Sequence, residues 1–158
     1  MAKDESFFDS RTAILASIPH RPPFLFVDQI TEWLDDGILC AYRFKPDEYF
    51  FEGHYPGMPI VPGVILCEAA MQAGAIYTAR ILSGNDDEKK TKLPVVGRMN
   101  DVKFKKLVRP GQKIEQLVTL KEEMAGAYIF KAKITCEGKL AVSFEFIVTL
   151  IDKFEDED

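Results

Sequence analysis

A histidine and a glutamate stand within fifteen residues of each other near the middle of the chain, in surroundings that suit acid–base chemistry. His54 lies in a stiff segment rich in glycine and proline, and a histidine exchanges its proton close to neutral pH. Glu68 lies among apolar residues, where desolvation is expected to raise its pKa toward the range that a general acid needs. Gln72 follows one helical turn later on the same face and could orient the carboxylate.

Gly63 supplies a third element of the same chemistry. Its N–H falls in the first turn of a predicted helix, where donors lack intrahelical partners and the positive end of the dipole favours an anion. Removing a proton next to a thioester carbonyl develops an enolate-like oxyanion, which such a donor stabilises. A base, an acid and an oxyanion donor together suit the α,β-elimination of water. The plainer alternatives are a histidine that caps a turn and a glutamate that reaches solvent or makes a structural hydrogen bond.

One long helix, predicted for residues 62–83, must position the glutamate. Pro62 suits the first helical turn, and Gly84 is a natural stop after the last one. The helix is apolar almost all round, which is typical of a helix that is either buried centrally or spans a membrane. Its few polar side chains and the polar sequences around it favour burial.

The remaining elements are predicted to surround that helix. A short helix is expected at residues 11–18, an ordered loop at 46–61 and a polar loop at 85–92. Runs with strand character occupy residues 23–33, 38–45, 95–99, 103–108, 114–124, 127–136 and 140–151. Antiparallel strands around one apolar helix predict an α+β domain.

The length of 158 residues predicts a single domain over residues 1–154, followed by an acidic tail at 155–158. Three cysteines without a CxxC pair, and only two histidines, match no zinc-site spacing and suit reduced thiols in the cytoplasm. Neither a signal peptide nor a membrane-spanning run is expected. The net charge of −5 argues against a nucleic-acid partner.

Positive charge is concentrated between residues 89 and 113, where nine lysines or arginines stand against one acid. This segment is either a solvated strand face or a landing surface for an acidic partner. Lys103 and Lys105 are expected to share one face of a strand, because side chains alternate along it.

Three stretches of the chain resemble the 3-hydroxyacyl-acyl-carrier-protein dehydratases of fatty-acid synthesis. They are IPHRPPFLFVD at residues 18–28, FFEGHYPGMPIVPGVILCEAAMQAG at 50–74 and VKFKKLVRPGQKI at 102–114. The middle stretch is the most specific, because GH-x-P, PGV and E-x-x-x-Q all stand at the spacing of that family. The resemblance covers roughly residues 12–150.

This resemblance implies a hot-dog fold, in which an antiparallel sheet wraps around the helix at 62–83. It implies that His54 and Glu68 are catalytic and that the Gly63 N–H binds the thioester carbonyl. It also implies a homodimer or a trimer of dimers with shared active sites, His54 coming from one chain and Glu68 from its partner. His20 stands in a motif of the family too, with a role that looks structural rather than catalytic.

No separate cofactor is implied, because the acyl chain is borne on the phosphopantetheine of acyl carrier protein. That carrier is acidic, which gives Lys103, Lys105, Lys106 and Arg109 a purpose as a docking surface. Two departures concern the substrate: Val95-Val96 stands where the family usually has an aromatic pair, often with a tyrosine gate, and Gln112 replaces the usual acid.

Three other functions fit parts of the pattern. An acyl-CoA thioesterase of the same fold would use a helix carboxylate and a helix N-terminus, but it would not require the GH-x-P histidine. A non-catalytic acyl-binding protein would have no reason to keep both His54 and Glu68. A specialised dehydratase acting beside a dedicated carrier is the third, and Val95-Val96 favours it.

Overall fold

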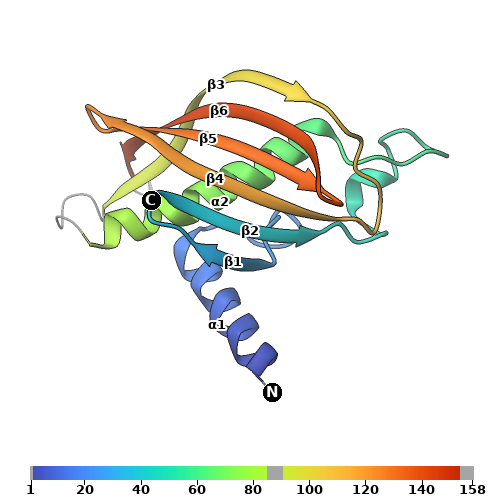
Figure 1. Cartoon of the computed structure of the whole chain (residues 1–158), viewed down its shortest axis with the longest axis horizontal. Coiled ribbons are helices and arrows are strands. Elements are labelled where there is room, and N and C mark those ends of the chain that lie inside the picture. Colours follow the sequence, from blue (N-terminus) through green and yellow to red (C-terminus); the bar gives the residue numbers. More distant parts are fainter. Residues whose placement is uncertain (1, 85–90, 154–158) are drawn as a thin grey trace, which may run out of the picture.

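The computed structural model describes residues 2–84 and 91–153, without the side chains of residues 2–9. Six strands form one antiparallel sheet in the order β1-β2-β4-β5-β6-β3 (Figure 1). Their bounds are β1 Gln29–Trp33, β2 Gly37–Arg43, β3 Lys92–Phe104, β4 Lys113–Met124, β5 Ala127–Cys136 and β6 Lys139–Asp152. The predicted acidic tail at 155–158 lies outside the described residues, as does most of the predicted loop at 85–92.

The sheet curves around α2, which runs from Gly63 to Ser83 across its concave side (Figure 1). Small residues make this close packing possible: Ala69, Ala70 and Ala73 are fully buried, and a Cβ on Gly74 would lie 2.6 Å from the Phe146 ring. Strand β5 alternates between buried and more exposed side chains, as expected of a sheet with one face on the core. The predicted α+β hot-dog architecture is confirmed.

Three predicted elements have different bounds in the structure. The helix expected at 11–18 is α1, which spans Ala2–Ser17. The runs at 95–99 and 103–108 are not two strands, because β3 continues through Phe104 with irregular register between Val96 and Arg98 and between Asn100 and Lys103. The strand expected at 23–33 is reduced to β1.

The segment before β1 is not a strand because side chains satisfy its backbone. The Phe26 N–H donates to Gln72 Oε1 at 2.8 Å, and the Phe26 carbonyl accepts from Gln116 Nε2 at 2.6 Å. Leu25, Phe26 and Val27 are buried all the same, so their apolar pattern reflects the core rather than a sheet ladder.

The ends of α2 differ in detail from the prediction. Pro62 is the N-cap residue rather than the first helical residue, and its ring offers no side-chain hydrogen bond to the first turn. Gly84 does end the helix, but with φ of −87° it is right-handed rather than in the left-handed conformation typical of a glycine stop. Near this end, Arg80 lies 4.4 Å from the centre of the Trp33 ring.

The two edges of the sheet are covered differently. Helix α1 packs against β1 at one edge, whereas β3 at the other edge pairs only with β6 among the described strands. Apolar side chains are exposed along β3, including Val96, Met99 and Phe104. Within the described ranges, no helix has both the length and the apolar character that crossing a membrane requires.

Candidate active site

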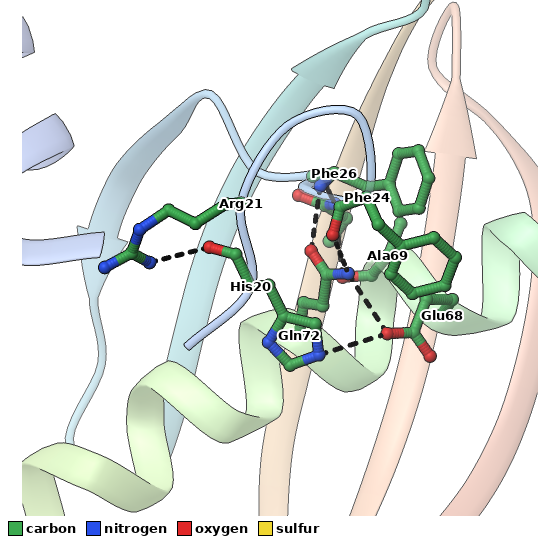
Figure 2. Close-up of polar contacts among 8 residues, drawn as sticks. His20, Arg21, Phe24, Phe26, Glu68, Ala69 and Gln72 are labelled. Atoms are coloured by element: carbon green, nitrogen blue, oxygen red, sulfur yellow. Dashed lines mark hydrogen bonds and ion pairs between the residues drawn. The ribbon is translucent and has the colours of Figure 1, made fainter. Parts of the chain in front are cut away.

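Glu68 lies in the second turn of α2 and is held by side chains from two parts of the fold (Figure 2). Gln72 Nε2, one turn later, donates to Glu68 Oε1 at 3.0 Å, as the i, i+4 spacing predicts. His20 Nε2, from the segment after α1, lies 3.5 Å from the same oxygen. Both contacts are made to Oε1, and Figure 2 shows the second carboxylate oxygen on the side away from them. That second oxygen is the one available to a substrate.

Gln72 is itself fixed, so the carboxylate rests on a rigid support. Its amide accepts from the Phe26 N–H and donates to the Phe24 carbonyl at 3.2 Å, and its side chain is almost fully buried. A buried amide whose donors and acceptor are all paired has one favourable orientation. The backbone of the segment before β1 therefore orients Gln72, and Gln72 in turn orients Glu68.

The expected upward shift in the pKa of Glu68 is wrong for the isolated chain. Burial raises the pKa of Glu68, but hydrogen bonds from His20 and Gln72, together with the charge on a protonated His20, lower it more. The physical reason is that its donors favour the ionised form, which the apolar neighbours in the sequence do not indicate. In this environment Glu68 is a carboxylate at neutral pH.

His54 lies in the ordered loop before α2, and its ring orientation is fixed by the backbone. The backbone N–H of His54 donates to the Phe50 carbonyl at 3.0 Å, and its ring Nδ1 lies 3.0 Å from the Ile60 carbonyl oxygen. A carbonyl oxygen can only accept, so Nδ1 must carry the proton of that hydrogen bond. In the neutral ring Nε2 is then unprotonated, which is the state of a general base. The ring also packs edge-on against Tyr55, whose φ of 57° turns the chain sharply.

Gly63 is the first residue of α2, where it has close contact with an aromatic ring. As the first residue of the helix, Gly63 has an N–H that no carbonyl of the same helix can accept, so this donor points out of the helix end. A Cβ at this position would lie 2.6 Å from the Phe104 ring. Any other residue would have to displace Phe104, which explains why a glycine stands here.

A large cavity of about 880 Å³ begins at Glu68 and follows α2. At the Glu68 end it is bounded by His20, Met71 and Gln72. Its walls farther along are mostly apolar and come from the end of α1 and the residue after it, from α2 and from β3: Leu15, Ile18, Ala75, Ala79, Leu82, Pro94, Val95 and Val96. The Val95-Val96 pair therefore faces the same cavity as the candidate catalytic carboxylate.

The two candidate catalytic side chains are not brought together within one chain. Glu68 lines the cavity, and His54 is absent from the residues that bound it. Among the described residues, the contacts of His54 are with its own loop, and those of Glu68 are with His20 and Gln72. His20 is the site residue that the sequence interpretation placed in a structural role. Its position within IPHRPPF, one of the three conspicuous motifs, was the available signal.

The predicted docking residues lie on both sides of Phe104 in the chain, Lys103 before it and Lys105, Lys106 and Arg109 after it. Lys103 is exposed on β3, but Lys105 lies beyond the end of that strand, so the expectation that the two share a strand face is wrong. Lys106 is engaged internally, with its ammonium 3.0 Å from the Cys136 carbonyl and 3.1 Å from Glu137.

Lys105 and Arg109 are both exposed. The Val61 N–H donates to the Val108 carbonyl at 2.8 Å, which ties the segment carrying these two cations to the residue just before Pro62. Both cations therefore lie beside the end of α2 that carries Gly63.

Comparison with known proteins identifies the family of this chain. The FabA-like domain family matches residues 18–145, which include both candidate catalytic residues. This chain belongs to that family. Its relatives include 3-hydroxyacyl-[acyl-carrier-protein] dehydratase FabZ of Clostridium botulinum, 38% identical over 147 residues that cover 92% of this chain and 98% of the relative. The protein of the same name from Geobacter metallireducens is 36% identical over 150 residues, covering 94% and 97%.

Solved structures carry the same fold at lower sequence identity. A dehydratase heterocomplex from Xenorhabdus doucetiae superposes with a TM-score of 0.72 at 17% identity, covering 89% of this chain and 91% of that one. A thioesterase from Haemophilus influenzae superposes with a TM-score of 0.58 at 16% identity, covering 82% of each chain. These two likenesses concern the fold alone, so they do not distinguish the members of the FabA-like family from thioesterases.

Proposed function

We propose that His54 and Glu68 carry out the reaction of this chain, which is a dehydratase of 3-hydroxyacyl groups borne on acyl carrier protein in fatty-acid synthesis. The activity follows from membership of the family and from relatives that match nearly the whole chain. The observation that supports the residue roles most directly is the pair of fixed proton-exchanging groups. In the neutral tautomer that its hydrogen bond favours, His54 has Nε2 without a proton, and Glu68 presents one uncommitted oxygen in the wall of a mainly apolar cavity.

In the proposed reaction, His54 Nε2 takes the proton from the carbon next to the thioester carbonyl. The electrons of that C–H bond form the new double bond as the C–O bond to the hydroxyl breaks. The hydroxyl leaves as water with a proton from Glu68, and the Gly63 N–H stabilises the charge that develops on the carbonyl oxygen. His54 ends protonated and Glu68 ionised, and return of one proton from His54 to Glu68 restores the site.

Glu68 must hold a proton for this step, although its pKa is lowered in the isolated chain. Its side chain is still 22% exposed to water. A bound acyl chain and a second protein chain remove that exposure, and desolvation then raises the pKa of the carboxyl. We therefore assign the protonated form to the complex with substrate rather than to the free chain.

The separation of His54 from the cavity supports a site shared between two chains. Strand β3 offers an edge with unpaired backbone groups, and exposed apolar side chains lie along it and just beyond it, at Val96, Met99, Phe104 and Leu107. An edge of this kind is stable when another strand pairs with it. We propose a homodimer through this edge, in which His54 of one chain meets Glu68 of the other. The trimer of dimers stays a prediction.

We propose that the cavity along α2 binds the acyl chain. From Glu68 to Leu82 the helix advances roughly 21 Å, at about 1.5 Å per residue. The walls along this length are apolar, which favours a hydrocarbon over water. With valines at positions 95 and 96, the wall at β3 lacks the bulk of an aromatic pair.

We propose that Lys105 and Arg109, with Lys103, receive the acidic carrier protein. Their exposure and the link between Val61 and Val108 place them beside the start of α2. Lys106 contributes less, because its ammonium already has a carboxylate and a carbonyl as partners. We also propose a cytoplasmic location, which suits three buried cysteines that are all free.

The function is tested by incubating the purified protein with a series of 3-hydroxyacyl groups of increasing length on acyl carrier protein. Mass spectrometry of the carrier should show the loss of one water and the appearance of the 2-enoyl product. Supplying the enoyl carrier instead should give the hydrated product, because an acid–base pair works in both directions. Release of free carrier without dehydration would indicate a thioesterase, and retention of unchanged substrate would indicate an acyl-binding protein.

A further inference from the structure

His20 is a second histidine at the candidate site, and its position is fixed from two sides. Arg21 donates to the His20 carbonyl at 2.7 Å and to the carbonyls of Leu15 and Ile18 at the end of α1, so the backbone is clamped to that helix. The ring of Phe24 stacks against the imidazole with 6.4 Å between centroids. A histidine held in this way is not a mobile surface side chain.

The surroundings of the His20 ring favour one neutral tautomer. Its Nδ1 is buried and has no hydrogen-bond partner among the described residues, whereas its Nε2 faces Glu68 Oε1 (Figure 2). A proton on Nδ1 would be a buried donor without an acceptor, which is costly. A proton on Nε2 instead points at a carboxylate. The ring is thus arranged to donate from Nε2 to Glu68.

The contact at 3.5 Å lies at the outer limit of a hydrogen bond. Contacts of catalytic groups are often long before substrate binds and shorten in the complex. Because Gln72 donates to the same oxygen, the two donors together determine the direction in which the other oxygen points.

We propose that His20 is a positioning residue of the dehydration reaction, holding Oε1 of Glu68 so that Oε2 faces the hydroxyl group of the substrate. This inference rests on the proposed role of Glu68. His20 does not itself exchange a proton with substrate; it acts through the carboxylate. It therefore differs from a merely structural residue, because its removal should change how Glu68 titrates.

The direction of that change follows from the groups around Glu68. Burial raises the pKa of its carboxyl, and the lowering influences come from His20 and Gln72. The other charged side chains of the same cavity are Arg21, Lys92 and Lys153. Arg21 is bound to the end of α1, and Lys92 is paired with Asp152. Lys153, like these two, is not among the groups that shift the pKa of Glu68, so none of the three replaces the lost donor. Without His20, the pKa of Glu68 should rise.

The test compares His20→Leu, which has no donor, with His20→Gln, whose amide nitrogen is separated from Cα by the same number of bonds as Nε2. Dehydration of a 3-hydroxyacyl carrier is followed from acid to alkaline pH. For His20→Leu we expect kcat to fall by about 10- to 100-fold, with KM changed less than about threefold. In a plot of kcat against pH, the fall in activity that reports the ionisation of Glu68 is the one that disappears in Glu68→Gln. In His20→Leu this fall should occur at higher pH. His20→Gln should restore most of kcat and return this fall toward its original pH.

A double variant shows whether His20 acts through Glu68. If it does, His20→Leu combined with Glu68→Gln should be no slower than Glu68→Gln alone. Circular dichroism and melting temperature verify the fold, and His20→Phe, which keeps the ring stacked on Phe24, serves if His20→Leu does not fold. An unchanged kcat and pH profile in a folded donor-less variant, or fully additive losses in the double variant, would overturn the proposal. If the wild type does not dehydrate at all, the proposed function fails first, and that result is distinct.

Discussion

Two histidines and one glutamate illustrate how neighbours rather than residue type determine a role. His54 has its Nδ1 committed to the Ile60 carbonyl, which leaves Nε2 as a base, while His20 has only Nε2 directed at a partner. The same ring nitrogen, Nε2, is thus an acceptor in the neutral His54 ring and a donor in His20. Glu68, between donors, is ionised in the free chain in spite of its burial.

His54→Ala should lower the rate of dehydration at least about 100-fold, because a positioned general base contributes about that much. The loop should survive the change, since the hydrogen bond from the residue 54 N–H to Phe50 does not involve the ring. Single-turnover kinetics with a 3-hydroxyacyl carrier measure the loss, and a melting curve checks the fold. Turnover like the wild type in a folded His54→Ala protein would remove His54 from the mechanism.

The sequence predicted the relation between Glu68 and Gln72 but missed that between Glu68 and His20. The first is a local consequence of helical spacing, so four residues of separation are sufficient to infer it. The second joins residues 48 positions apart and depends on how the segment after α1 folds back over α2. The direction of the Glu68 pKa was missed for the same reason, since one of its two donors lies far away in the sequence.

At the scale of elements, α2 was predictable almost to the residue, because a long apolar run between a proline and a glycine has few alternatives. The strands were predictable as a set but not in their order. Strand β3 was divided in two because Asn100 and Asp101 interrupt its strand-like pattern, and the structure accommodates them as an irregularity in register between Asn100 and Lys103. The placement of β3 beside β6 follows from long-range pairing that no local pattern reports.

The part of the cavity wall that α2 forms should determine which acyl chains the site accepts. Ala75 and Ala79 line the cavity roughly 10 Å and 16 Å beyond Glu68 along the helix, at about 1.5 Å per residue. Ala75→Leu should leave short substrates unaffected and reduce kcat/KM for long ones, by about fourfold for each methylene excluded, since each contributes about 0.8 kcal/mol.

Ala79→Leu is the matched control for this measurement, because it adds the same side chain one turn deeper. The acyl-chain length at which kcat/KM begins to fall should be longer for Ala79→Leu than for Ala75→Leu when both are assayed on the same length series. Equal losses at all lengths in both variants would show damage to the fold and would count against the cavity as the acyl site.

At the scale of the whole molecule, a shared site predicts complementation between two inactive proteins. His54→Ala chains and Glu68→Gln chains should each be nearly inactive, yet a mixed dimer contains one site with both native residues. Refolding the two variants together in equal amounts should restore about a quarter of the wild-type activity, since random mixing makes half of the dimers mixed and each has one of two sites intact. Native mass spectrometry verifies that the chains have exchanged. No recovery in verified mixed dimers would mean that each chain holds its own complete site.

Carrier recognition should depend on charge and therefore on salt. Lys105→Glu combined with Arg109→Glu is expected to raise KM for carrier-linked substrate, and added salt should have the same effect on the wild type. A small pantetheine thioester has no acidic surface and should be processed almost as before. Lys131→Glu with Lys133→Glu, on exposed positions of β5, changes the net charge equally and is the matched control. Equal effects of the two pairs, or equal losses on both substrates, would exclude a specific docking surface.

The order of strands in the sheet also has a consequence for how the chain is made. Strand β3 leaves the ribosome before β4, β5 and β6, yet β6 is the only described strand that pairs with it, and 47 positions separate Lys92 from Lys139. At ordinary rates of synthesis that interval lasts roughly 2 to 10 s. During this time a thirteen-residue strand with apolar side chains has neither edge paired. Folding is therefore a late event in translation, and chains that terminate before β6 should be drawn into aggregates through β3.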